Sequence, residues 1–153
     1  VCIDCETTGL DPKEDRVIEV ACVVFNQKEI LESFESLINP ERPIPEESTK
    51  IHNITDEMVR KSKTIDKVLP TIIQMMGSHP VVGHGIGFDV QLMIEGANRH
   101  SIPHTLDKNT QIDTLRLARL YGNSPTNALD MLRPHFNIEA QGAHRAMGDV
   151  LVN

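Results

Sequence analysis

Residues 16–26, RVIEVACVVFN, form a long run that is mostly apolar and rich in β-branched side chains. Such a run is typical of a central strand, which is covered on both faces. Residues 1–5 (VCIDC) and residues 30–38 (ILESFESLI) show the alternation of further strands. Because the three segments are joined by short connections, they predict an antiparallel meander.

The chain changes character after residue 40, where a proline-bearing loop leads into helical patterns. PVVGH at residues 80–84 predicts a short buried strand, and TQID at residues 110–113 predicts another, followed by a helix that Asp113 or Thr114 caps. Thr126 is expected to cap the helix after that. Helices are expected at about residues 46–50, 55–60, 65–76, 88–99, 114–121, 126–135 and from 143 onward.

Three strands followed by strands that alternate with helices predict an α/β fold. We expect a mixed five-stranded sheet, made of the meander and parallel strands, with helices on both faces. The 153 residues suit one domain. The chain opens with Val1 inside an apolar run, so we interpret residues 1–153 as a single domain truncated at both ends. No apolar run approaches the roughly 20 residues that span a bilayer, so no membrane association is expected.

Cys2, Cys5 and Cys22 are odd in number and lie in strand-like runs. This pattern favours reduced thiols in a cytoplasmic protein over a disulfide framework. The C-x-x-C spacing of Cys2 and Cys5 also fits a redox or zinc half-site, although residues three apart in a strand point to opposite faces.

The net charge of −7 is unusual for a protein that binds nucleic acid, because such proteins normally present basic side chains to the phosphates. The charge is compatible with a nuclease if the acidic residues gather at one site that holds divalent cations. Asp4 and Glu6 are two apart at the end of the first strand, so their side chains leave the same face about 6 to 7 Å apart. Paired carboxylates suit Mg²⁺ or Mn²⁺, although acids at a strand end are also often simply solvated.

Three further polar residues are weak signals when each is taken alone. Asp89 lies in the first turn of an expected helix, where the helix dipole already favours an acid. His144 and Asp149 lie near the end of the chain, where an isolated histidine or aspartate has many structural explanations. Four carboxylates gathered about 6 Å apart would repel by roughly 3 kcal/mol per pair at an effective dielectric near 20, which two dications would neutralise.

Taken together, the motifs resemble the DEDDh exonuclease family, which includes the proofreading subunit of the bacterial replicative polymerase, ribonuclease T and oligoribonuclease. The resemblance covers nearly the whole chain, and its motifs occur in the family's order. They are D-x-E-T-T-G-L at residues 4–10, I-H-N-I-T at residues 51–55 with Asn53 in place of the family's glycine, H-x-x-x-F-D at residues 84–89, and H-x-A-x-x-D at residues 144–149. Gly85 stands where the family often has asparagine.

The resemblance implies a ribonuclease H-like fold, a set of cofactors and a role for each matching residue. Asp4, Glu6, Asp89 and Asp149 would hold two divalent cations, Mg²⁺ or Mn²⁺, and His144 would take a proton from the attacking water. The remaining matches would contact the substrate, and they are Thr7, Thr8, Gly9, Leu10, His84 and Phe88.

The activity that the resemblance implies is 3′→5′ hydrolysis of single-stranded nucleic-acid ends with release of nucleoside 5′-monophosphates. The sequence leaves open DNA or RNA as substrate, and proofreading beside a DNA polymerase or independent trimming. Two other functions stay open. One is a catalytically idle scaffold that tethers a polymerase, and the other is a metal hydrolase of small phosphoesters.

Overall fold

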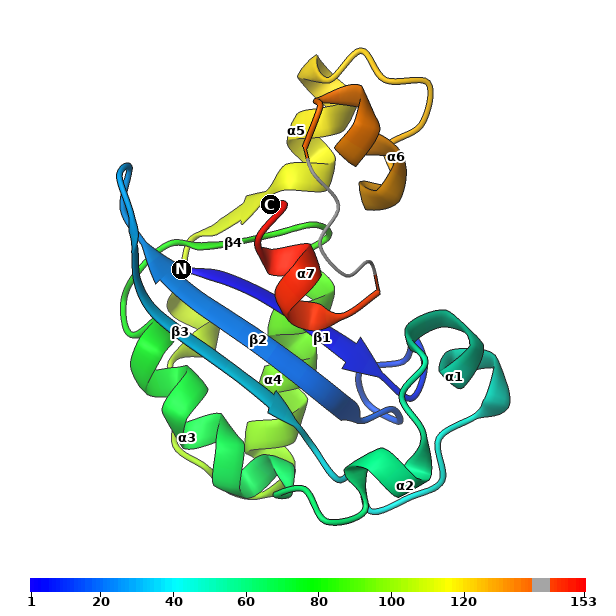
Figure 1. Ribbon diagram of the computed structural model, residues 1–153. Coiled ribbons are helices and arrows are strands. Elements are labelled where there is room, and N and C mark those ends of the chain that lie inside the picture. Colours follow the sequence, from blue (N-terminus) through cyan, green and yellow to red (C-terminus); the bar gives the residue numbers. More distant parts are fainter. Residues whose placement is uncertain (139–143) are drawn as a thin grey trace.

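The structure, a computed structural model, describes residues 1–138 and 144–153. Within these ranges one mixed sheet runs through the molecule, with strands in the order β3-β2-β1-β4-β5 (Figure 1). The strands are β1 (Cys2–Thr7), β2 (Val17–Phe25), β3 (Ile30–Leu37), β4 (Val81–Gly83) and β5 (Gln111–Asp113). The first three pair antiparallel, and β1, β4 and β5 pair parallel. The predicted mixed five-stranded sheet is therefore confirmed.

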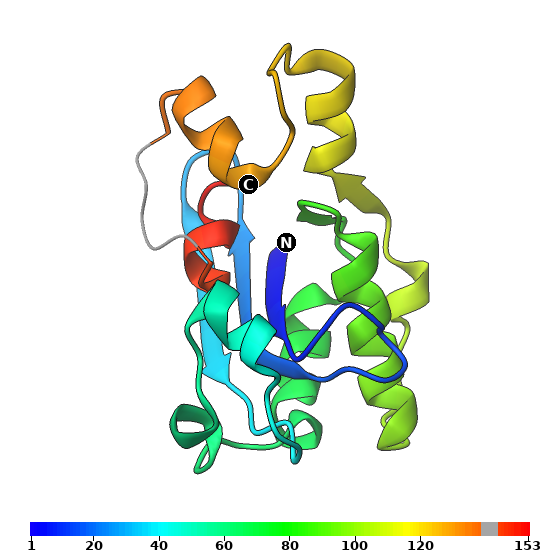
Figure 2. The ribbon, with the colours of Figure 1, turned by 90° about the vertical axis from the view of Figure 1, so that its right-hand side faces the viewer.

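Helices lie on both faces of the sheet, as predicted. Figures 1 and 2 show α3 and α4 behind it and the short α7 in front of β1 and β2. The helices are α1 (Glu46–His52), α2 (Asp56–Val59), α3 (Ile65–Met76), α4 (Gly87–Arg99), α5 (Thr114–Tyr121), α6 (Leu129–His135) and α7 (Ala146–Val150), with a 3₁₀ turn, η1, at Leu106–Lys108. None of the described helices has the length and apolar character needed to cross a membrane.

The main core fills the space between the back of the sheet and helices α3 and α4. Ile3 of β1 and Val20 and Cys22 of β2 point to this side, where they meet Leu69 of α3 and Met93 of α4. Their strand neighbours point to the front, because side chains alternate along a strand. The front row pairs Cys2 with Val23, Asp4 with Ala21, and Glu6 with Glu19.

Local signals explain several helix boundaries. Thr55 caps α2 by accepting from the Met58 amide, and Asp113 caps α5 by accepting from the Leu115 and Arg116 amides. Thr126 does not cap α6, contrary to the expectation. Its hydroxyl accepts from the amide of Ala128, which itself occupies the N-cap position, so the helix begins at Leu129. The final helix is expected from residue 143, which lies outside the described ranges. The structure describes this helix from Ala146 onward.

Candidate active site

Three carboxylates that are far apart in the sequence meet on the front face of the sheet. Asp4 and Glu6 leave this face of β1, and Asp149 approaches from α7. Each offers an oxygen, and these oxygens all lie within 4.8 Å of one another. Small Ala21 lies opposite Asp4 in the ladder and packs with Ala146 and Val150, which lets α7 lie close over the strands. A cluster of this kind supplies the oxygen ligands that hard divalent cations prefer.

Asp89 reaches the site from α4, on the other side of the sheet. Strand β4 pairs with β1 at Cys2↔Val82 and ends at Gly83, after which the chain turns into α4. The first turn of α4 therefore lies beside the later part of β1, and the nearby Cys5 opposes part of the rise that burial causes in the Asp89 pKa. Asp89 is not part of the group whose oxygens lie within 4.8 Å, but its charge is, after burial, the largest cause that raises the Asp4 pKa.

The environment of these carboxylates favours their protonated forms. Burial, followed by the charge of Asp149, raises the pKa of Glu6 to about 7, and burial raises the pKa of Asp89 to about 7. The pKa of Asp4 is raised well above its usual value by burial and then by Asp89 and Asp149. Buried anions that repel one another are stabilised by a bound cation. The donor set and its electrostatics therefore fit a divalent-metal site.

Asp149 and His144 each pair with a charged side chain of α6. Asp149 forms a buried ion pair with Arg133, which offsets part of the effect of burial, the main cause that raises the Asp149 pKa. The Arg133 Nε and Nη1 atoms have no hydrogen-bond partner among the described residues. His144 adopts a left-handed backbone conformation with φ 56°, and its Nε2 lies 2.9 Å from a carboxylate oxygen of Asp130. Imidazole and Asp149 thus flank the same site.

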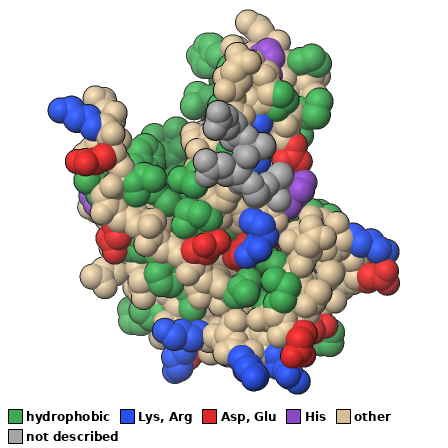
Figure 3. All heavy atoms as spheres, in the orientation of Figure 1, with side chains coloured by type: hydrophobic (Ala, Val, Ile, Leu, Met, Phe, Trp, Pro, Cys, Tyr) green, Lys and Arg blue, Asp and Glu red, His purple; other side chains and the backbone are tan. Residues whose placement is uncertain are grey.

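A cavity of about 290 Å³ opens over the cluster and is lined by residues of β1, α6 and the last segment of the chain. Acidic, basic and histidine side chains gather near the middle of this face (Figure 3). The lining residues are Asp4, Cys5, Glu6, His84, Ala128, Leu129, Asp130, His144 and Asp149. Both ring nitrogens of His84 are already engaged, Nδ1 with the Thr114 hydroxyl at 3.1 Å and Nε2 with the Asn127 carbonyl at 2.8 Å.

The turn after β1 holds the other residues that the sequence associates with substrate. Thr8 is buried, and its hydroxyl donates to Asp15 at 2.8 Å and accepts from the Arg16 amide at 3.0 Å. The Thr7 hydroxyl donates to the Gly9 carbonyl at 2.6 Å, and a Cβ on Gly9 would collide with Asp15. These contacts shape the turn.

Two further residues of the predicted substrate set differ sharply in exposure. Leu10 is 87% exposed, a large apolar side chain free to contact a ligand. Phe88 is half-buried against the main core. Neither these two residues nor the three before Leu10 are among those that line the 290 Å³ cavity.

The I-H-N-I-T segment places a buried histidine, His52, near the end of β1. Asn53 ends α1 in the left-handed conformation, with φ 59°, which explains why asparagine substitutes for the family's glycine here. The neighbouring His52 accepts from the Ile54 amide through Nδ1 at 3.0 Å, and burial lowers its pKa. The segment therefore lies beside the end of β1, near Thr7, Glu19 and Arg145.

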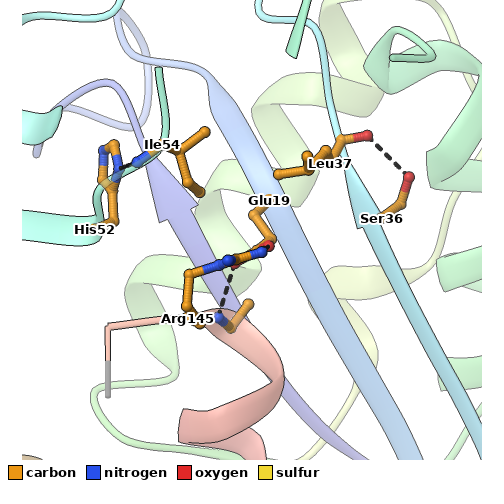
Figure 4. A network of polar contacts seen from close by, with 7 residues as sticks. Glu19, Ser36, Leu37, His52, Ile54 and Arg145 are labelled. Carbon is orange, nitrogen blue, oxygen red and sulfur yellow. Dashed lines mark hydrogen bonds and ion pairs between the residues drawn. The ribbon is translucent and has the colours of Figure 1, made fainter. Parts of the chain in front are cut away.

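Sequence reasoning missed four charged residues around the site: Glu19, Asp130, Arg133 and Arg145. A signal existed for Glu19, because a lone carboxylate within the apolar run at residues 16–26 must find a partner when the strand is buried. In the structure it pairs with Arg145 and the Ala146 amide (Figure 4). Asp130 and Arg133 gave no signal, since acidic and basic residues are ordinary in the first and last turns of an exposed helix.

Comparison with known proteins identifies relatives over the full length of the chain. The RNase_T family model, which describes exonucleases, matches residues 1–153. The DNA polymerase III PolC-type of Clostridium perfringens is 36% identical over 150 residues, and that of Latilactobacillus sakei is also 36% identical over 150 residues. These matches include 97% of this chain but only 10% of each relative, so the chain spans about a tenth of their length.

Solved exonucleases share the fold. Exonuclease X in complex with 5′ overhanging duplex DNA matches with a TM-score of 0.75 and 28% identity, covering 99% of this chain and 84% of that one. Escherichia coli exonuclease I in complex with a dT13 oligonucleotide matches with a TM-score of 0.84 and 19% identity, covering 99% of this chain and 38% of that one. The ribonuclease H-like fold expected from the motifs is therefore confirmed.

Proposed function

The chain belongs to the RNase_T exonuclease family, and we propose that it is a 3′→5′ exonuclease that releases nucleoside 5′-monophosphates from single-stranded nucleic-acid ends. The observation that carries the proposal is the meeting of Asp4, Glu6 and Asp149 with ligand oxygens within 4.8 Å of one another. Exonuclease X and exonuclease I, which share the fold, support the reaction class.

We assign the metal site to Asp4, Glu6, Asp89 and Asp149, which would hold two divalent cations, Mg²⁺ or Mn²⁺. When bound, such ions supply an acidified water and offset the charge that develops on the leaving 3′ oxygen. The protein's own contribution is to hold the carboxylates of β1 and α7 together, with Asp89 of α4 beside β1, before substrate arrives. Their raised pKa values make the site costly to ionise without cations.

His144 is assigned as the acceptor of the proton that the attacking water loses. An imidazole suits this role because its unperturbed pKa, near 6.5, lets it gain and lose a proton close to neutral pH. Its Nε2 is 2.9 Å from Asp130, which orients the ring and stabilises the imidazolium formed when the proton is accepted. The imidazole borders the same cavity as Asp4 and Asp149, so it has access to a water placed there.

We further propose that Leu10 and the turn at residues 7–10 contact the terminal nucleotide. Leu10 is exposed at the end of the strand that carries the carboxylates, so an apolar contact with the last base would bury it favourably. Thr8, by contrast, would act by shaping the turn, because its hydroxyl is occupied by Asp15 and the Arg16 amide. We also propose that the protein is cytoplasmic and proofreads beside a DNA polymerase, because its relatives are DNA polymerases III of the PolC type.

Incubation of a 5′-labelled single strand with the protein and Mg²⁺ or Mn²⁺ tests the proposal directly. We expect a descending ladder of products that disappears with chelator and with Asp4→Ala. Parallel DNA and RNA strands identify the substrate, and a 3′-labelled strand that releases labelled mononucleotide first fixes the direction. A strand that stays intact in both metals contradicts the proposal.

The same assay separates the two alternatives. A catalytically idle scaffold leaves all strands intact while the protein still binds a polymerase. A hydrolase of small phosphoesters cleaves a nitrophenyl phosphate faster than it shortens the oligonucleotide. Either result replaces the exonuclease assignment.

A further inference from the structure

We propose that Glu19 and Arg145 are positioning residues, which hold α7 and thereby place Asp149 against Asp4 and Glu6. The inference rests on the proposed function, because it concerns how the same metal site is built. Neither residue belongs to the four-carboxylate set. Both act through the helix that carries one member of it.

Helix α7 has little to hold it in place on its own. It is five residues long, and it contains Gly148, the residue that favours helix least after proline. Helices this short are unstable in isolation. Its N-cap residue, Arg145, makes no side-chain cap hydrogen bond. Its buried apolar contacts on the sheet are small, with Ala146 and Val150 packed on Cys2, Ala21 and Val23.

Glu19 of β2 supplies the N-terminal cap and the ion pair that hold α7 on the sheet. It is fully buried on β2, on the front face and opposite Glu6. One carboxylate oxygen, Oε2, accepts from the Ala146 amide at 3.0 Å and so caps the helix from a neighbouring strand. The other oxygen forms an ion pair with Arg145 Nη2 at 2.5 Å, and Arg145 Nε lies 3.0 Å from both oxygens. Figure 4 shows the two side chains end to end between β2 and the start of α7.

The pair also keeps a fifth carboxylate from disturbing the site. Glu19 faces Glu6 across the β1–β2 ladder, and its carboxylate is paired with the Arg145 guanidinium. A buried carboxylate without a partner would be strongly destabilising at this place. Arg145 therefore lets Glu19 serve as a cap without adding a net charge beside Glu6.

A change in this cap would directly affect the position of Asp149, because the two lie on the same short helix. Asp149 lies three residues after Ala146, so both belong to one turn of the same helix. A functional group generally has to be held within about 0.5 Å of its working position. Loss of the cap would let the first turn of α7 move, and Asp149 would move with it.

The test compares Mn²⁺ binding by variants of the 153-residue chain, measured by calorimetry and by the electron paramagnetic resonance of free Mn²⁺. Glu19→Met removes the acceptor and the charge at similar size, whereas Glu19→Gln keeps an oxygen that can accept from Ala146. Val59→Ala is the control, because Val59 packs in a separate small cluster with Ile18, Ile44 and Ile54. It lowers stability without touching α7.

We expect Glu19→Met to weaken Mn²⁺ binding by about 10- to 100-fold, the usual effect of losing a residue that supports a metal ligand. Glu19→Gln should lose less, and Val59→Ala should bind as the wild type does although it unfolds at lower denaturant. Unchanged Mn²⁺ binding by Glu19→Met overturns the inference. Should that variant fail to fold, Arg145→Lys takes its place, with a several-fold loss expected and unchanged binding again overturning it.

Amide hydrogen exchange in chelator separates this inference from the proposed function. Glu19→Met should speed exchange of the Asp149 and Leu151 amides relative to those of β2, whether or not the site is a nuclease. Failure of the wild type to bind Mn²⁺ would refute the proposed metal site alone. Equal exchange of the α7 amides in Glu19→Met and wild type would refute the positioning role alone.

Discussion

The two faces of the sheet differ in what their residues do. Behind it, α3 and α4 bury a continuous apolar core against Ile3, Val20 and Cys22. In front, the same two strands present Asp4, Glu6 and Glu19, and the cover is the short α7 with few apolar contacts. Adjacent residues of one strand point to opposite faces, so β1 and β2 contribute apolar side chains to the core behind and carboxylates to the front. The apolar core at the back stabilises the fold enough to offset the repulsion between the carboxylates at the front.

The largest effect should come from removing one front carboxylate. Asp4→Asn is expected to abolish exonuclease activity, a loss larger than the roughly 100-fold that follows from losing a supporting residue of a metal site. The free energy of unfolding in chelator should stay the same or rise, because burial and Asp89 already raise the Asp4 pKa. Activity assays and urea unfolding measure both. A clear loss of stability in this variant would break the contrast between the faces.

The next effect concerns the imidazole. His144→Ala should lower turnover by about 10²- to 10⁴-fold, the range expected for loss of a general base. Mn²⁺ affinity should stay close to that of the wild type, because His144 pairs with Asp130 and is not one of the clustered residues that could hold the metal. Single-turnover rates and Mn²⁺ titration check the two parts. Normal turnover would remove His144 from the proposed mechanism.

On the back face the expectation reverses. Leu69→Ala, at a fully buried position of α3, should cost about 2 to 5 kcal/mol of stability, the usual range for such a cavity. Activity per folded molecule should change little at a temperature where the variant is folded. Denaturant unfolding and active-site-normalised rates test this. A fall in turnover comparable to that of His144→Ala would show that the two faces are not separable.

The last effect is a dependence of stability on pH. The Glu6 pKa is raised from 4.5 to about 7 by burial and Asp149, so the folded protein binds this proton more tightly than the unfolded chain. The resulting stabilisation is complete below about pH 4.5 and is lost as pH rises through 7. At 1.36 kcal/mol per pKa unit it is on the order of 3 kcal/mol from Glu6.

Urea unfolding in chelator between pH 5 and 8 should therefore show stability falling as pH rises. Saturating Mn²⁺ should flatten that slope, because a bound cation favours the ionised carboxylates. The Glu6→Gln variant serves as the control and should show a shallower slope in chelator. A stability that rises with pH would contradict the electrostatic account of the front face.

Much of the fold could be predicted because its signals are local. Residues 16–26 have the composition of a buried strand, residues 65–76 have an amphipathic helical period, and Asp113 stands where a cap is needed. Thr126 shows the limit of such signals. It has the right chemistry for a cap, but the chain places Ala128 at the N-cap position. Cap chemistry identifies candidates, whereas backbone geometry decides among them.

The candidate site divides in the same way. The resemblance of the ordered motifs to the DEDDh exonucleases singled out Asp4, Glu6, Asp89, His144 and Asp149. The partners of these residues did not follow, since Glu19 and Arg145 are 126 residues apart and nothing local marks Arg133 as the partner of Asp149. The hydrogen bonds of Thr8 with Asp15, and of His84 with Thr114 and Asn127, could not be predicted from the sequence either.

By itself the sequence determined the sheet, most of the helices and the kinds of side chain available for chemistry, because strand alternation, helical period and motif order are properties of neighbouring residues. Only the tertiary structure decided which charges meet. It set Asp149 beside Asp4 and Glu6, and paired Glu19 with Arg145 beneath the start of α7. The physical reason is that ion pairs and carboxylate repulsion depend on distances in space. Those distances are set only when β1, β2 and α7 fold onto one another.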